Sequence, residues 1–226
     1  MTRQVTLAAF AAAMLLAGSA QADIITPGFT FAVADGDHFH SNTGGAFGNP
    51  AGKAEVGRYS SEVVKGLSEY SLAGLTNQTS AFVTFGVFKE GGLFAGTNDT
   101  PFTGNIRVVA YQGNNTEDLS DFSAASVGDV GSFFVSAALV DVGDIFSFDI
   151  TAIYNNAIDL GWTSLGIRLE QDPVQSASQA WTFDNFRLTT DNQTTGGIPE
   201  PGTWALMIGG FGIAGTALRR RRAFAL

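Results

Sequence analysis

The segment Phe146-Ser147-Phe148-Asp149-Ile150 alternates strictly between apolar and polar side chains. Because successive side chains of a β-strand point to opposite faces of the sheet, this pattern predicts a strand with one face in the core and the other in water. A second strong run, Ala81 to Phe88, places Val83, Phe85 and Val87 on one face. Both runs indicate that the chain is built on β-sheet.

Short runs of aromatic and β-branched residues recur through the middle of the chain, with Gly, Asn and Asp between them. Besides the two runs above, they predict strands at Phe29 to Val33, Val56 to Val64, Glu69 to Leu72, Ile106 to Tyr111, Phe133 to Val140, Leu165 to Leu169 and Trp181 to Leu188. Thr151 to Ile158 is predicted to be one short helix. About nine short strands without a repeating helical pattern favour an all-β fold, an antiparallel β-sandwich.

The first 22 residues have the three regions of a secretory signal peptide. Arg3 provides a positive start, and an uncharged, mostly apolar run follows from Val5 to Ala17. Ala20-Gln21-Ala22 has the small-x-small form that a signal peptidase accepts, so the sites read by the peptidase are Ala20 and Ala22. The apolar run is shorter than the roughly 20 residues of a membrane span. We expect export through the Sec translocon and a mature chain that begins at Asp23.

The other end of the chain has the pattern of an oriented membrane anchor. Residues 191–197 form a polar linker, after which Pro199-Glu200-Pro201 is stiff because proline fixes φ. The apolar stretch 204–218 starts at Trp204 and ends at a basic block, Arg219-Arg220-Arg221-Arg222. Arginines stay on the cytoplasmic side of a membrane, and Trp suits the opposite interface. At 1.5 Å per residue this helix would cover roughly 22 Å, less than the hydrocarbon core of about 30 Å.

The order of the tripeptide, the apolar span and the basic end closely resembles the PEP-CTERM sorting domain of Gram-negative bacteria. The resemblance covers residues 198 to 222. It implies that an exosortase, a membrane transpeptidase, recognises the Pro-Glu-Pro and removes the tail. An ordinary tail anchor is the alternative. The expected organisation is a signal peptide (1–22), a β-sandwich domain (23–190), a linker (191–197) and a sorting tail (198–226) that anchors the chain transiently in the inner membrane before it reaches the cell surface or the exterior.

The composition of the middle region narrows the class of protein. Five of the 12 basic residues and one of the 21 acidic residues lie in the two end segments, so the middle holds seven basic and 20 acidic residues and a net charge of −13. Such acidity excludes nucleic acid as a partner. It is typical of a soluble secreted protein and would also attract divalent cations. The absence of cysteine excludes disulfides, thiol chemistry and zinc–thiolate sites.

Three segments of the middle region resemble carbohydrate-binding jelly-roll modules. Ser68 to Leu75 followed by Ser80 to Phe88 looks like an early strand pair of such modules, Phe146 to Thr151 followed by Leu165 to Leu169 looks like their later part, and Trp181 to Leu188 looks like a closing strand. The resemblance favours a jelly-roll topology and assigns no sugar. Sugar binding would need exposed aromatic side chains, although most aromatics of a sandwich fill its core. The candidates are Tyr59, Tyr70, Tyr111, Tyr154, Trp162 and Trp181.

The only two histidines of the chain are His38 and His40. In an extended segment they point to the same side as Asp35 and Asp37, so this segment would offer two carboxylates and two imidazoles to a metal. If an ion binds, calcium held by Asp35, Asp37 and backbone carbonyls is favoured, although the full ligand series of an EF-hand is missing. The alternative is an ordinary polar loop. No other cofactor is expected.

The sequence contains no nucleophile elbow, zinc-protease helix, phosphate loop or dinucleotide fingerprint. No catalytic residue is therefore predicted. We expect a non-enzymatic protein of the cell surface or extracellular matrix that associates with secreted polysaccharide. The alternative is a secreted carbohydrate-active enzyme, which would need two carboxylates in a cleft at a separation of about 5 to 10 Å.

Overall fold

The computed structural model describes residues 23–41 and 51–190, and this part of the chain is an antiparallel β-sandwich. Every strand pairing in it is antiparallel, which confirms the predicted all-β class. The strands are β1 (Ile24–Ile25), β2 (Phe29–Ala34), β3 (His38–Ser41), β4 (Ala54–Tyr59), β5 (Glu62–Ser71), β6 (Ala81–Lys89), β7 (Gly104–Gly113), β8 (Ser126–Val135), β9 (Ile145–Asp149), β10 (Ser164–Asp172) and β11 (Ala180–Thr190). Between them lie the helix α2 (Thr151–Asp159) and the 3-10 helix η3 (Leu119–Phe122).

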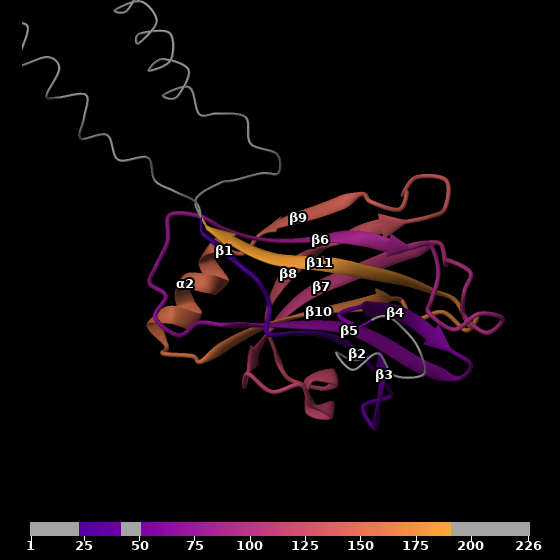
Figure 1. Cartoon of the computed structure of the whole chain (residues 1–226), viewed down its shortest axis with the longest axis horizontal. Coiled ribbons are helices and arrows are strands. Elements are labelled where there is room, and N and C mark those ends of the chain that lie inside the picture. Colours follow the sequence, from indigo (N-terminus) through magenta and orange to yellow (C-terminus); the bar gives the residue numbers. More distant parts are fainter. Residues whose placement is uncertain (1–22, 42–50, 191–226) are drawn as a thin grey trace, which may run out of the picture. The chain divides into compact units, whose positions relative to one another are not determined.

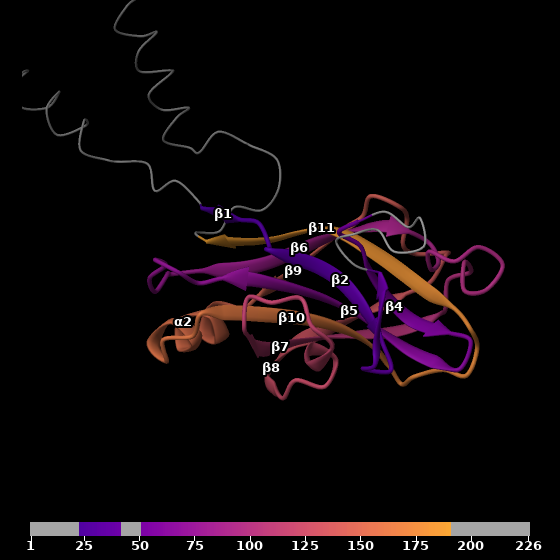
Figure 2. The same cartoon turned by 60° about the horizontal axis from the view of Figure 1, so that its bottom comes forward.

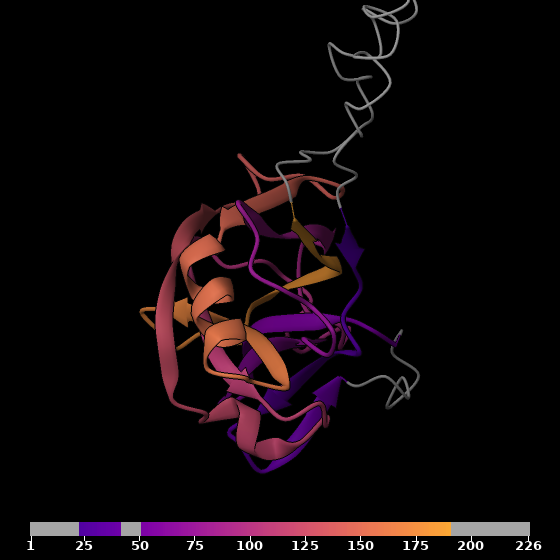
Figure 3. The same ribbon diagram turned by 90° about the vertical axis from the view of Figure 1, so that its left-hand side faces the viewer.

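The strands follow one path, β8-β7-β10-β5-β4-β11-β6-β9, which folds into two layers (Figures 1 and 2). Strand β4 connects the layers because it pairs with β5 at Gly57–Tyr59 and with β11 at Ala54–Gly57. On its other side β5 pairs with β2, which in turn pairs with β3. Helix α2 covers one end of the sandwich and buries Tyr154 and Ala157 (Figure 3). The jelly-roll topology implied by the resemblance stays a prediction.

Phenylalanines fill the core where the two ends of the strand path meet. The ring of Phe85 in β6 lies 5.0 to 5.9 Å, between centroids, from the rings of Phe133, Phe146, Phe148, Phe183 and Phe186. The rings of Phe133 in β8 and Phe146 in β9 are 4.1 Å apart. Side-chain packing therefore closes the sandwich where no backbone ladder joins these two edge strands within the described residues.

The predicted alternation of the two strongest strands is confirmed. Val83, Phe85 and Val87 are buried, whereas Ser147 and Asp149 are exposed beside the core-facing Phe148. The predicted helix is also present, one residue longer than expected. These segments agree with the sequence because their apolar periodicity is strong.

Two strand predictions were wrong in extent. The run Val56 to Val64 is broken by a turn at Ser60, whose positive φ of 55° ends β4. The run Phe133 to Val140 ends at Val135, where a turn begins with hydrogen bonds to the carbonyl of Ser136. Strand β8 instead starts at Ser126 and contains two glycines and an aspartate, which weakens its β signal. Strand β3 was not predicted.

The predicted signal peptide, linker and sorting tail lie outside the described residues, as do their site residues Ala20, Ala22, Pro199, Glu200, Pro201, Trp204 and Arg219 to Arg222. No helix within 23–41 and 51–190 is long and apolar enough to cross a membrane. The span predicted at 204–218 is not among the residues that this finding covers.

Candidate metal centre

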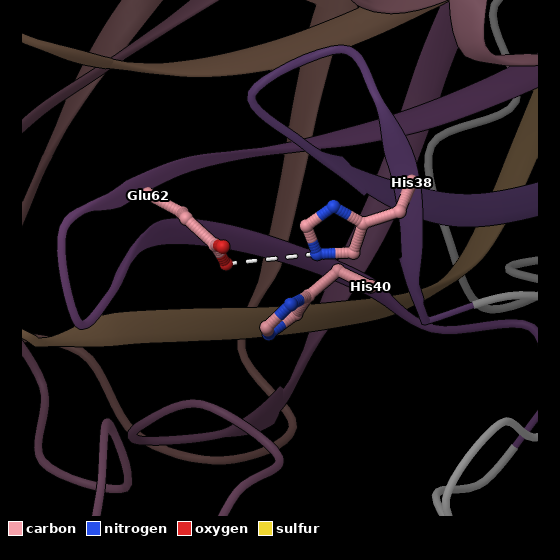
Figure 4. A group of neighbouring side chains, drawn as sticks. All are labelled: His38, His40 and Glu62. Atoms are coloured by element: carbon pink, nitrogen blue, oxygen red, sulfur yellow. Dashed lines mark ion pairs between the residues drawn. The ribbon is translucent and has the colours of Figure 1, made fainter.

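Two hairpins meet at one edge of the sandwich and bring both histidines close to a glutamate. His38 and His40 stand two residues apart in β3, so their side chains leave the same face of the strand, as predicted. Glu62 is the first residue of β5, directly after the β4–β5 turn. One ligand atom from each of these side chains lies within 4.8 Å of the other two. Figure 4 shows the three side chains converging.

The members of this cluster differ in exposure. Nε2 of His38 lies 3.6 Å from Oε2 of Glu62, and these side chains are 46% and 33% exposed. His40 is only 3% exposed. The cluster therefore has a buried side formed by His40 and an open side that water or a solute can reach.

The two aspartates of the predicted site have other partners. Oδ1 of Asp37 lies 2.5 Å from Nδ1 of His38, on the far side of the imidazole ring from the nitrogen that faces Glu62. Oδ1 of Asp35 accepts a hydrogen bond from the backbone N–H of Val63 at 2.6 Å, and Asp35 adopts a positive φ of 49° in the β2–β3 turn. The structure thus brings His38 and His40 together with Glu62, which the sequence did not predict as a ligand. Asp35 instead connects the β2–β3 turn to β5 through its hydrogen bond with Val63.

His40 sits in a cage that no simple pattern in the sequence predicts. Its ring packs against Tyr59 and Phe94 at centroid distances of 4.9 and 4.5 Å. Its Nε2 is 2.9 Å from Oε1 of the fully buried Glu55, but the two atoms do not form a well-aligned hydrogen bond. Glu55 is itself held by the N–H of Leu93 at 2.7 Å and by the amide of Asn98 at 2.5 Å. Sequence reasoning missed Glu55 because it is one of many acidic residues and lies in a short strand.

A second buried acidic group anchors the loop after β7. Oε2 of Glu69 accepts hydrogen bonds from the backbone N–H groups of Asn114 and Asn115 and from the hydroxyl of Ser164, at 3.2, 2.9 and 2.9 Å. Its Oε1 accepts one from the hydroxyl of Tyr111 at 3.3 Å. A buried carboxylate with four donors is well satisfied, which identifies Glu69 as a structural link between β5, β7 and β10.

Asp121 of η3 lies against Glu69. Burial, then the charges of Glu69 and Asp118, raise the pKa of Asp121 to about 7, and a hydrogen bond with Glu69 adds to the rise. Two carboxyl groups in hydrogen-bonding contact are closer than the 5 Å or more that separates the pair in a glycoside hydrolase. They are also buried, so the Glu69–Asp121 pair does not have the geometry of that catalytic pair.

The aromatic candidates for sugar stacking are mostly in the core. Tyr70, Tyr111, Tyr154 and Trp181 are completely buried. Trp162 is partly buried and packs against the main core, and Tyr59 belongs to the cage around His40. None of these six candidates offers a freely exposed ring, so they form no open stacking platform.

Comparison with known protein families identifies the tail. The model of the PEP-CTERM protein-sorting motif matches residues 197–222. The chain carries a PEP-CTERM motif. This match agrees with the resemblance carried by Pro199-Glu200-Pro201, the apolar span and the basic block, and it means that the protein is exported and sorted by an exosortase-like membrane transpeptidase.

Comparisons of the whole chain give no indication of its function. None of the curated proteins matches it. A solved structure described as a crystal structure of domains CD (residues 230–489) shares 15% identity with it, and the match covers 76% of this chain and 64% of that chain with a TM-score of 0.27. The chain thus spans less than two thirds of that structure, and a likeness this distant carries no argument about function.

Proposed function

We propose that the β-sandwich is a non-enzymatic component of the cell surface or extracellular matrix. The observation that carries this proposal is the PEP-CTERM motif at residues 197–222, because such a motif delivers an exported domain to the envelope. The domain before it is acidic and free of cysteine, as suits a soluble protein that works outside the cytoplasm.

The use of the buried ionisable groups supports the non-enzymatic part of the proposal. Glu69 is committed to four hydrogen-bond donors, and Glu55 is committed to Leu93 and Asn98. Each of these carboxylates holds neighbouring segments of the fold together. This is the role expected of charged groups in a structural domain.

The finer part of the proposal is association with secreted polysaccharide. It is supported by the PEP-CTERM resemblance, since many bacteria with this sorting system make exopolysaccharide. Because the six candidate aromatic side chains provide no stacking platform, the contact would be made mainly by polar groups of the surface.

The first experiment determines the ends of the protein recovered from the native cell envelope and from the medium. We expect intact mass and terminal sequencing to give a start at Asp23 and an end near Pro199-Glu200-Pro201. A chain that still ends at Leu226 and stays in the membrane fraction would contradict sorting by cleavage.

The second experiment tests the role of the sorted protein. Purified protein is mixed with exopolysaccharide from the same cells and, as a control, with neutral dextran, and both are sedimented. Co-sedimentation with the exopolysaccharide alone, without release of reducing sugar, is expected. Release of reducing sugar would overturn the non-enzymatic assignment and favour a carbohydrate-active enzyme.

A further inference from the structure

We propose that His38, His40 and Glu62 form a binding site for a divalent transition-metal cation, with Zn²⁺ the best-suited ion. This inference is independent of the proposed function and concerns only the edge of the sandwich where β3 meets the β4–β5 hairpin. It differs from the calcium site expected from the sequence, because the third ligand is Glu62 and the two aspartates have other tasks.

The spacing of the ligand atoms suits this class of ion. Ligands at 2.0 to 2.1 Å from a tetrahedral Zn²⁺ lie about 3.3 Å from one another. Nε2 of His38 and Oε2 of Glu62 are already 3.6 Å apart, and all three ligand atoms lie within 4.8 Å. His38 and Glu62 are partly exposed, so small side-chain rotations can close the remaining gap.

The chemistry of the donors selects the metal. Imidazole nitrogen suits Zn²⁺, Cu²⁺ and Ni²⁺, whereas Ca²⁺ takes six to eight oxygen ligands. Two imidazoles and one carboxylate form a donor set found for zinc. The carboxylate of Asp35, which a calcium site would need, already accepts from the N–H of Val63.

The surroundings of the histidines provide a second, independent observation. His40 is 97% buried, and its Nε2 lies 2.9 Å from Oε1 of Glu55, so Nδ1 is the ring nitrogen that would bind an ion in this cluster. Each imidazole also has a carboxylate beside it: Asp37 at His38 and Glu55 at His40, at 2.5 and 2.9 Å. Metal-bound histidines almost always have such an outer carboxylate or carbonyl, which orients the ring and raises its basicity.

A bound ion would add a side-chain link between two hairpins that already pair through β2 and β5. His38 and His40 belong to the β2–β3 hairpin, and Glu62 belongs to the β4–β5 hairpin. The fourth coordination position would face solvent on the side of His38 and Glu62. We therefore expect the ion to stabilise the fold as well as to bind.

The test uses the full chain, purified and stripped of metal with a chelator. Isothermal titration with Zn²⁺ and elemental analysis after dialysis are expected to give one ion per chain. Thermal unfolding should shift to higher temperature with Zn²⁺, because a ligand that binds the folded state stabilises it.

Variants of His38 and Glu62 distinguish this site from adventitious binding. Both side chains are partly exposed, so replacing them should leave the fold and the buried His40 intact. His38→Gln and Glu62→Gln should each weaken Zn²⁺ binding by about tenfold or more, whereas Asp141→Asn, which removes an exposed carboxylate elsewhere, should leave it unchanged. Equal affinity in all four proteins, no saturable binding, or a preference for Ca²⁺ over Zn²⁺ would overturn the proposal.

Discussion

The ring of Tyr111 in β7 lies directly over Gly166, its paired neighbour in β10. A Cβ added at Gly166 would be 2.1 Å from Cζ of that ring, far inside any real contact. The aromatic ring thus covers the gap left by the missing side chain, an arrangement that pins the register of neighbouring strands. Tyr111 also donates its hydroxyl to Glu69, so the same ring links the strand pairing to the buried carboxylate.

Substituting Gly166→Ala should therefore destabilise the domain by several kcal/mol, because the Tyr111 ring is buried and cannot move aside without strain in the core. Gly28→Ala is the matched control, since its nearest neighbour would be 4.0 Å away. Urea unfolding of both variants measures the difference. Equal midpoints would show that the contact between ring and glycine does not constrain the sheet.

Phe85 is the centre of the phenylalanine cluster that closes the sandwich. Phe85→Ala should lower the free energy of unfolding by about 3 to 5 kcal/mol, because it leaves a cavity among five surrounding rings. Phe134→Ala, at a position that is 49% exposed in β8, should change it by only about 0.5 kcal/mol. Chemical denaturation compares the two, and similar losses would contradict closure through Phe85.

The buried pair Glu69 and Asp121 makes stability depend on pH in a defined direction. The pKa of Asp121 rises from 3.8 to about 7 on folding, so the folded state keeps a proton that the unfolded chain releases. Its contribution to stability is complete below about pH 4 and is lost as the pH rises toward 7. The wild type should thus lose stability relative to Asp121→Asn, which stays neutral throughout, across this window.

The measurement for this pair is the free energy of unfolding of both proteins at pH 4, 5.5 and 7. Asp129→Asn supplies the control, because Arg107 lowers the pKa of Asp129 below 3.8 through a hydrogen bond, so that stabilisation is lost only below about pH 4 and the difference from the wild type should stay nearly constant between pH 4 and 7. A constant difference in the free energy of unfolding between wild type and Asp121→Asn over the whole range would refute the raised pKa of Asp121.

The residues show which features the sequence could predict. The strands around Phe85 and Phe148 were predictable because their side chains alternate with a period of two, and the parity of His38 and His40 follows from the same rule. The sequence predicted Asp35 and Asp37 as the acidic partners of the histidines, whereas the structure places Glu62 there. Glu62 reaches the histidines only because the β4–β5 turn at Ser60 lies beside the β2–β3 turn. That neighbourhood results from the long-range pairing of β2 with β5, which no local pattern encodes.

The burial of individual polar side chains could not be predicted from the sequence either. Glu55 and Glu69 look like any other acidic residue in the sequence, yet both are buried by strands that are distant along the chain. The aromatic candidates Tyr70, Tyr111 and Trp181 could equally have been surface or core residues, and only the packing of the two layers places them inside. Local periodicity therefore predicts the strands, whereas sites depend on which strands become neighbours.

Substitutions at the two ends of the sorting tail should disturb sorting in different ways. Replacing Arg219 to Arg222 with glutamine removes the positive charge that is predicted to keep the end of the span in the cytoplasm. We expect much of this variant to pass into the periplasm or medium with Leu226 still present. Replacing Pro199 and Pro201 with alanine leaves the charge intact, so this variant should stay in the membrane fraction at full length. Fractionation followed by intact-mass measurement separates the two outcomes, and normal processing of both variants would contradict recognition of the tail through these residues.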